Sequence, residues 1–149
     1  MGPTWRGYIT DNSPRPAAIA VCIDDTDRIL IIRRSNIDDR GGQWTIPGGH
    51  VDDTDRSLEA AASRELEEET DLVVLLEDLQ FLGEPKPEKY YFLAKKWCGD
   101  VDISIPNPKT GKIEHDEHKW ATIKEIKEIT NSEIPIYLLE KALEMSKNE

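Results

Sequence analysis

Short runs of mostly apolar residues, separated by polar segments, recur along the chain and predict a series of β-strands. The runs are rich in β-branched and aromatic residues and are bounded by turn residues, which is typical of strands. We expect strands at residues 17–24, 28–33, 44–46, 72–76, 80–83, 89–97, 101–105 and 119–123. The first two flank the tripeptide Asp25-Thr26-Asp27, which indicates a hairpin between them.

Two other segments have the pattern of helices. Every residue from 57 to 70 is an acceptable helix former, and Ser57 can cap the first turn. Residues 134–146 form a second, amphipathic pattern, whose apolar face carries Ile136, Leu139 and Leu143. Strands interrupted by one helix and followed by another predict an α+β fold, in which a mixed sheet is covered on both faces.

The length of 149 residues suits one domain with a single core. Residues 1–16 are polar and interrupted by prolines, so we expect an N-terminal arm before a domain that spans residues 17–149. No apolar run approaches the roughly 20 residues that span a bilayer, and the first residues lack the apolar region of a signal peptide. These absences predict a cytoplasmic protein, with Cys22 and Cys98 as buried free thiols.

The charge balance limits the kinds of partner that the chain can bind. Nineteen basic residues stand against thirty acidic ones, which gives a net charge of −11. The average field therefore repels polyanions, and we expect neither a nucleic-acid polymer nor a membrane surface as partner. A small phosphorylated ligand stays compatible with this charge, because a bound divalent cation reverses the local field.

One acidic cluster needs an explanation. In the segment Arg64-Glu65-Leu66-Glu67-Glu68-Glu69, the side chains of Glu65, Glu68 and Glu69 share one face of the predicted helix. Their charges repel each other, and the single guanidinium of Arg64 cannot neutralise three carboxylates. A hard divalent cation such as Mg²⁺ can, because it prefers a few carboxylate ligands together with water and substrate phosphates.

A solvated acidic helix face is the alternative interpretation, since glutamate is a common surface residue of helices. The segment before the helix favours a site. Trp44-Thr45-Ile46-Pro47-Gly48-Gly49 places two glycines at the end of a strand, where backbone groups can approach a ligand closely. A carbonyl of this turn can add a further metal ligand.

These residues together resemble the Nudix box of the MutT-like pyrophosphohydrolases. Residues 64–69 match its R-E-U-x-E-E segment at every position, where U is aliphatic, and Leu72 matches its last aliphatic residue. The sequence departs from the box at two positions. Asp55 stands where the box has a glutamate, with one extra residue between it and Arg64, and Asp71 replaces a glycine. The resemblance implies an α/β/α sandwich, a mixed sheet with the helix of the box on one side and the C-terminal helix on the other.

The resemblance also implies roles for individual residues. Glu68 and Glu69 are then the principal metal ligands, the Gly48 carbonyl is a further ligand, and Glu65 is a ligand or the base that activates water. Residues 114–120 resemble a later strand that returns to the metal, so Glu114 is expected as a further ligand or base, with Glu117 as the competing choice. Arg64 is expected to orient a glutamate within this catalytic group.

Substrate contacts are less closely defined. Arg33 and Arg34 end a predicted strand and can bind phosphate, although plain surface charges explain them equally well. We expect Gly49 to bring its backbone close to the substrate. The three histidines, His50, His115 and His118, are interpreted as neutral surface residues. Trp44 and Trp120 are interpreted as residues of the core or of a pocket wall.

The expected function is hydrolysis of a diphosphate linkage in a small nucleotide, with Mg²⁺ or Mn²⁺ as cofactor. The substrate is a nucleoside triphosphate or a nucleoside-diphosphate derivative; Pro87, which follows the box by about fifteen residues, resembles a marker of ADP-ribose and nucleotide-sugar pyrophosphatases. Two other classes use the same fold, an isopentenyl-diphosphate isomerase, which needs a cysteine, and a non-catalytic binding domain, which often loses the glutamates. The sequence leaves the oligomeric state open, a homodimer included.

Overall fold

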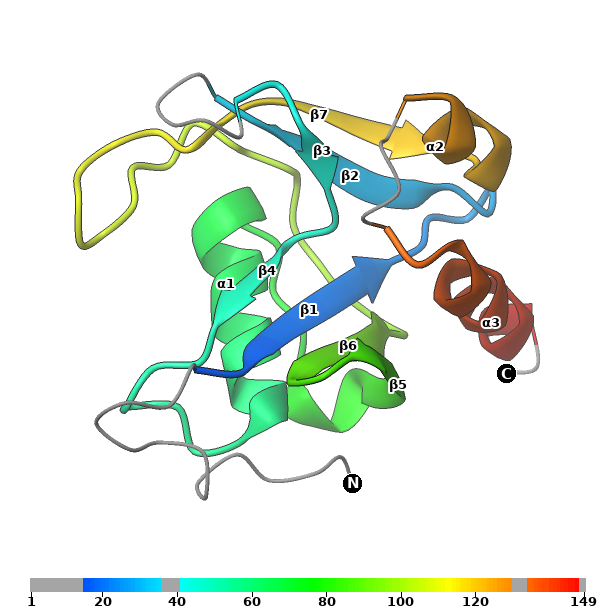
Figure 1. Cartoon of the computed structure of the whole chain (residues 1–149), viewed down its shortest axis with the longest axis horizontal. Helices are drawn as coiled ribbons and strands as arrows, with labels where there is room; N and C mark the ends of the chain where they lie inside the picture. The colour runs from blue at the N-terminus through cyan, green and yellow to red at the C-terminus, as the bar shows by residue number, and fades with distance from the viewer. Residues whose placement is uncertain (1–14, 36–40, 130–133, 148–149) are drawn as a thin grey trace.

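The computed structural model describes residues 15–35, 41–129 and 134–147, and its order of elements is shown in Figure 1. The predicted arm over residues 1–16 lies outside these residues except for Arg15 and Pro16. The elements are β1 (Ala17–Cys22), β2 (Ile29–Arg34), β3 (Trp44–Thr45), β4 (Gly48–His50), α1 (Leu58–Thr70), the short 3₁₀ helix η2 (Leu76–Asp78), β5 (Leu79–Lys86), β6 (Lys89–Ala94), β7 (His115–Ala121), α2 (Ile123–Ile129) and α3 (Ile136–Lys147).

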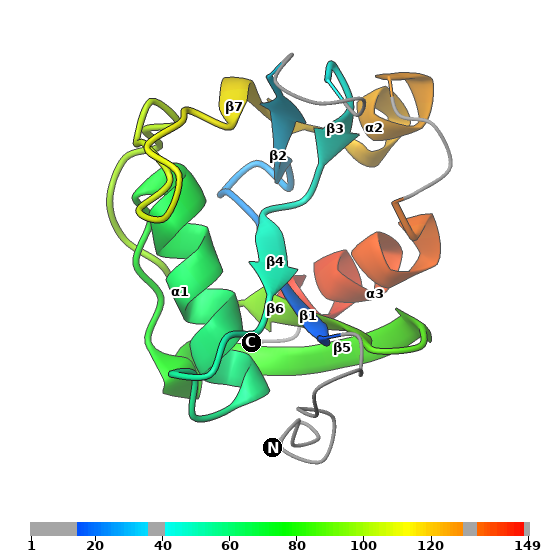
Figure 2. The ribbon, with the colours of Figure 1, turned by 60° about the vertical axis from the view of Figure 1, so that its left-hand side comes forward.

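The strands form two sheets. Four of them pair in the order β4-β1-β6-β5, where β1 runs parallel to β6 and antiparallel to β4, so this sheet is mixed. The other three pair antiparallel in the order β3-β2-β7. Helix α1 packs against β1 and β4, while α3 packs against β5 (Figure 2). The α+β fold with one helix on each side of a mixed sheet is therefore confirmed.

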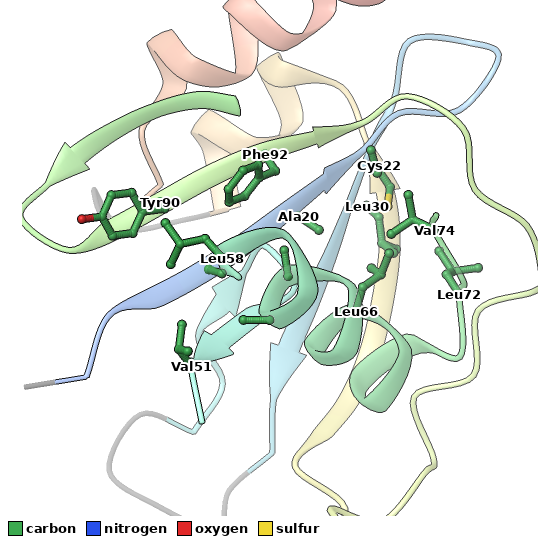
Figure 3. Close-up of a cluster of buried hydrophobic side chains, with 14 residues drawn as sticks. Ala20, Cys22, Leu30, Val51, Leu58, Leu66, Leu72, Val74, Tyr90 and Phe92 are labelled. Atoms are coloured by element: carbon green, nitrogen blue, oxygen red, sulfur yellow. The ribbon is translucent and has the colours of Figure 1, made fainter. Parts of the chain in front are cut away.

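The residues of β1 explain why both faces of the sheet are covered. Ala18, Ala20 and Cys22 point into a core cluster with Leu58 and Leu66 of α1 (Figure 3). The alternate residues, Ile19 and Val21, join a second cluster with Leu138 and Leu139 of α3. Since successive side chains of a strand point to opposite faces, a strand that is apolar at every position is buried on both sides.

The predicted hairpin between the first two strands is wrong. The turn itself is present, with Asp27 at φ 61° and the Asp24 carboxylate accepting hydrogen bonds from the backbone N–H groups of Thr26 and Arg28. After one isolated bridge between Ile23 and Ile29, however, β1 and β2 diverge into different sheets. Their register is set by partners that are distant in the sequence.

Two further predicted strands do not form. Residues 72–76 make one isolated bridge, between Val73 and Cys98, and residues 101–105 have no strand geometry. Leu72 and Val74 of the first segment are buried, whereas Leu75 and Leu76 are exposed. The Cys98 side chain is also exposed, which corrects its expected burial, whereas Cys22 is buried.

One α-helix, α2, and one strand, β4, were not predicted, and neither was the short 3₁₀ helix η2. Strand β4 includes both glycines of the expected turn, and α2 follows β7 directly. The backbone N–H of Glu125 donates to Thr122 Oγ1, and the Thr122 N–H donates to Glu125 Oε1, so the start of α2 has a capping box. That T-x-x-E pattern was a local signal for the missed helix. In the described part of the chain, no helix is both long and apolar enough to cross a membrane.

Candidate active site

Helix α1 begins and ends where the sequence predicts, which fixes the direction of its acidic face. Ser57 Oγ accepts a hydrogen bond from the Ala60 N–H and caps the first turn. Asp71 closes the last turn in the left-handed conformation, with φ 65°. Between these caps, Glu65, Glu68 and Glu69 line one small cavity. Its other lining residues are Ile103, Ile105, Asn107, Glu114 and His115.

Arg64 links this acidic face to the loop that precedes the helix. Its guanidinium makes two hydrogen bonds to the buried carboxylate of Asp55, Nε–Oδ1 at 2.9 Å and Nη2–Oδ2 at 2.8 Å. Its Nη1 donates to Glu65 Oε1 and to Glu68 Oε1, both at 3.1 Å. The hydrogen bond to Asp55 is the main cause of the raised pKa of Arg64. Arg64 therefore orients the two glutamates, and Asp55 anchors it.

The two glycines of β4 lie where two other elements approach closely. A Cβ atom on Gly49 would stand 2.5 Å from Glu65 Oε2, and one on Gly48 would stand 2.7 Å from the Ala18 carbonyl oxygen. The Gly48 N–H also donates to Glu69 Oε1 at 2.8 Å. A side chain at position 48 would push β4 away from the backbone of β1, so glycine is required there, whereas a side chain at position 49 would displace the Glu65 carboxylate.

The cavity holds more negative charge than its neighbours relieve. Burial raises the pKa of Glu65 to about 7, and it raises the pKa of Glu69 well above its usual range, with a further contribution from Glu65. Carboxylates held together in this way bind hard divalent cations through oxygen. Within the described ranges, no three acidic, histidine or cysteine side chains lie close enough together to form a complete metal site. The chemistry of the carboxylates fits such a cation, and Arg64 donates hydrogen bonds to two of them, Glu65 and Glu68.

The strand β7 determines which of the later glutamates reaches the cavity. Glu114, immediately before β7, lines it, and its Oε1 accepts a hydrogen bond from Asn107 Nδ2 at 3.0 Å. Glu117 is exposed and its Oε2 pairs with Arg33 Nη1 at 3.0 Å instead. The loop of residues 101–114 lies beside α1, and its Asp102 N–H donates to the Thr70 carbonyl (Figure 2).

Comparisons with known proteins agree with this arrangement. A model of the NUDIX domain family matches residues 13–141, which is most of the chain. The chain belongs to the Nudix family. An RNA pyrophosphohydrolase of Bartonella tribocorum is 27% identical over 124 residues, which cover 70% of each chain. Nudix hydrolase 15, mitochondrial, of Arabidopsis thaliana is 30% identical over 109 residues, which cover 68% of this chain and 38% of the relative.

Solved structures show the same fold. The MutT NUDIX hydrolase from Burkholderia pseudomallei matches with a TM-score of 0.60 and 24% identity, over 89% of this chain and 98% of the other. An ADP-ribose pyrophosphatase from Streptococcus suis matches with a TM-score of 0.63 and 19% identity, over 92% and 95%. The chain is therefore a Nudix hydrolase with the fold of these enzymes, and its family generally uses divalent metals.

A larger groove of about 510 Å³ adjoins the Nudix glutamates. Glu69 and His115 line both the cavity and the groove. Aromatic and basic side chains of β2, β3 and β6 line part of the rest, and they are Arg34, Trp44, Lys89 and Tyr91. Arg33 points elsewhere: its guanidinium pairs with Asp116 at 2.8 Å and lies 5.8 Å from the centre of the Trp44 ring. Of the two predicted phosphate-binding arginines, Arg34 is the one in the groove.

His115 differs from the surface histidine that the sequence suggested. It is 4% exposed, whereas His50 and His118 are exposed as expected. Burial lowers the pKa of His115 to about 4, and the charge of Arg34 adds to this shift. Trp44 lines the groove, and Trp120 stacks on Trp97 with 5.2 Å between ring centres.

Sequence reasoning missed four residues of this region, which are Lys89, Tyr91, Asn107 and His115. Strand β6 brings Lys89 and Tyr91 to the groove through its parallel pairing with β1, and no local pattern signals that contact.

Proposed function

We propose that this Nudix hydrolase cleaves the diphosphate linkage of a small nucleotide, with Mg²⁺ or Mn²⁺ as cofactor. The observation that carries the proposal is the junction of two spaces: a cavity with four glutamates opens beside a groove with aromatic and basic walls, and the two share Glu69 and His115. A diphosphate joined to a nucleoside has two parts that match these spaces. The anionic diphosphate matches a cation held in the cavity, and the flat base matches the aromatic walls of the groove.

The glutamates would hold the metal. Glu68 and Glu69 are the proposed principal ligands, and Glu65 and Glu114 are the additional carboxylate ligands at the cavity. The carbonyl of Gly48, whose N–H donates to Glu69, is a further candidate. When bound, a divalent cation neutralises diphosphate oxygens and lowers the pKa of water.

The protein's own groups would handle the proton. Glu65, whose burial raises its pKa to about 7, is suited to accept a proton from the attacking water at neutral pH. Glu114 is the competing base, held in place by Asn107. Arg64 would keep Glu65 and Glu68 in position through the hydrogen bonds that it donates to both.

The groove would bind the nucleoside side of the substrate. Trp44 offers a ring for stacking on a base, and Arg34 offers a guanidinium to a phosphate. Gly49, which also lines the groove, would allow its backbone to approach the substrate. These features suit a nucleoside triphosphate or a nucleoside-diphosphate derivative equally.

ADP-ribose and nucleotide sugars are the narrower candidates. The similar fold of the Streptococcus suis ADP-ribose pyrophosphatase supports this class at the level of the fold. Pro87 adds little support, because it has a structural role: it precedes Glu88, at φ 65°, in the turn between β5 and β6.

The isomerase alternative has less support. The pKa of the buried Cys22 thiol is raised to about 12, and neither cysteine is among the residues that line the cavity or the groove. A binding domain without activity is disfavoured because the three glutamates of the R-E-U-x-E-E segment, Glu65, Glu68 and Glu69, are retained.

The test is phosphate release from a panel of nucleoside triphosphates, ADP-ribose, nucleotide sugars and dinucleoside polyphosphates, with MgCl₂ or with EDTA. We expect at least one member to be hydrolysed with Mg²⁺ or Mn²⁺ and none with EDTA. Hydrolysis that survives EDTA would contradict the metal role. Tight binding of a nucleotide without turnover would favour the binding domain.

A further inference from the structure

His115 carries an unusual polar atom. Its Nε2 is fully buried and finds no hydrogen-bond partner among the described residues. Buried polar groups in native structures are nearly always paired, so an exception needs an explanation. The same side chain lines both the glutamate cavity and the groove, which places it where the two spaces meet.

The pairing of β2 with β7 places a second donor beside this ring. Arg34 is the cross-strand partner of His115, and the register shifts between Arg33 and Arg34, which marks a β-bulge. Directly paired residues point to the same face of a sheet, and bulges often redirect a side chain next to an active site. Both Arg34 and His115 accordingly line the groove, while Arg33 pairs with carboxylates outside it.

The chemistry of the junction indicates what the ring should bind. The glutamates around it, when ionised, accept hydrogen bonds and donate none. A substrate phosphate also presents acceptors, so it needs donors from the protein. Ring and guanidinium N–H groups on adjacent strands supply such donors, as in other phosphate-binding sites.

We propose that His115 Nε2–H donates a hydrogen bond to a non-bridging oxygen of the substrate phosphate at the junction of the cavity and the groove. This inference rests on the proposed function and adds a substrate-binding residue to it. The bond satisfies the buried nitrogen only when substrate is present, so His115 helps to select ligands with a phosphate at that place.

Kinetics of matched variants test the role. Asn and Gln both carry an amide, but only the longer side chain of Gln reaches the place of Nε2. H115N should raise KM about tenfold for the best substrate of the panel, as expected for the loss of a hydrogen bond to a charged group. H115Q should recover most of this loss, and kcat should change little in either. H118N is the control, because His118 is exposed on the same strand.

A second measurement avoids turnover. The ring nitrogens of the three histidines are followed by NMR, first with MgCl₂ alone and then with methylenediphosphonate added. The proposal expects the His115 Nε2 signal to move on addition of the diphosphonate and to remain a protonated nitrogen. A signal that moves with the metal alone and loses its proton would make His115 a metal ligand and overturn the proposal.

The outcomes separate the two proposals. If diphosphonate shifts the ring signals of His50, which also lines the groove, but leaves those of His115 unchanged, binding in the groove is supported and the role of His115 is wrong. If neither histidine responds to Mg²⁺ and diphosphonate together, and no member of the nucleotide panel is hydrolysed, both proposals fail. H115Q and H115N variants that lose substrate affinity equally, at unchanged melting temperature, would also overturn the hydrogen bond.

Discussion

The glutamate cavity and the adjoining groove are built in different ways. Three of the four cavity glutamates come from two turns of α1, and Arg64 on the same helix braces two of them. The groove instead collects side chains from β1, β2, β3, β4, β6 and β7. The proposed cation site thus depends mainly on spacing within one helix, while the proposed ligand groove depends on pairing between distant strands.

The two spaces also differ in charge. The cavity concentrates carboxylates whose burial raises the pKa values of Glu65 and Glu69, whereas the groove includes Arg34 and Lys89 beside its aromatic walls. Glu69 belongs to both. A metal would remove the repulsion in the cavity and at the same time attract the phosphate end of a ligand from the groove.

Removing one cavity ligand should have the largest effect. E69Q and E68Q should each reduce kcat by about a hundredfold or more, because a lost metal ligand removes several kcal/mol of transition-state stabilisation. In EDTA, E69Q should melt at or above the wild-type temperature, since it removes a buried charge and can still accept the Gly48 hydrogen bond. Turnover near the wild-type rate in both variants at saturating Mg²⁺ would contradict the assignment.

The charge of the cavity should be visible in the pH dependence of stability. Glu65 has a pKa of about 7 in the folded protein against 4.5 normally, so between these values the folded state binds more protons. Its contribution to stability is present below pH 4.5 and is lost as pH rises to about 7. In EDTA, the free energy of unfolding of E65Q should therefore rise relative to that of wild type between pH 4.5 and 7, by on the order of 1–3 kcal/mol.

The contribution of His115 to stability has the opposite pH dependence, because its pKa in the folded protein, about 4, lies below the usual 6.5. Its contribution is present above pH 6.5 and is lost as pH falls toward 4. Urea denaturation of wild type and E65Q at each pH cancels this shared effect. A difference that does not grow with pH would contradict the raised pKa of Glu65.

A substitution at the border should affect the cavity more than the groove. In G49A the new Cβ would contact the Glu65 carboxylate, so that side chain must move, and kcat should fall about tenfold. G83A is the matched control, because its nearest neighbour is the flexible tip of Leu138 at 3.1 Å. Equal activity of the two variants would show that the position of Glu65 is not critical.

A variant of a groove residue should instead change KM more than kcat. W44L should raise KM about fivefold while kcat changes little, because the lost stacking surface binds the nucleoside before and during the reaction. Tyr137, an exposed aromatic residue of α3, provides the control Y137L. A fall in kcat without a change in KM would instead place Trp44 with the catalytic group.

The smallest effect is expected at the end of α1, outside both spaces. Asp71 has φ 65°, a conformation that glycine adopts at lower cost, and its charge is unfavourable at the helix C-terminus. D71G should raise the free energy of unfolding by about 0.5 kcal/mol and leave kcat/KM unchanged. D71A keeps the strained backbone and removes the charge, so thermal denaturation of both variants separates the two causes. A clearly less stable D71G would indicate another role for Asp71.

Local patterns predicted the parts of the molecule that depend on neighbours in the sequence. The bounds of α1, its cap at Ser57 and the left-handed Asp71 follow from helix periodicity and capping preferences. The close approach of Gly48 and Gly49 to neighbouring groups was also predictable from the sequence, because glycines at the end of a strand allow close contact. Residues 72–76 and 101–105 show where local patterns fail, since an apolar run that pairs with no other strand forms no sheet.

By itself, the sequence determined that three glutamates share one helix face and that a strand with two glycines precedes it. The tertiary structure decided which distant residues join them. It selected Glu114 over Glu117 and Arg34 over Arg33, and it buried His115. The reason is that side chains alternate along a strand, so register determines which residues face inward, and the register of β7 on β2 is set by contacts more than 80 positions apart in the chain.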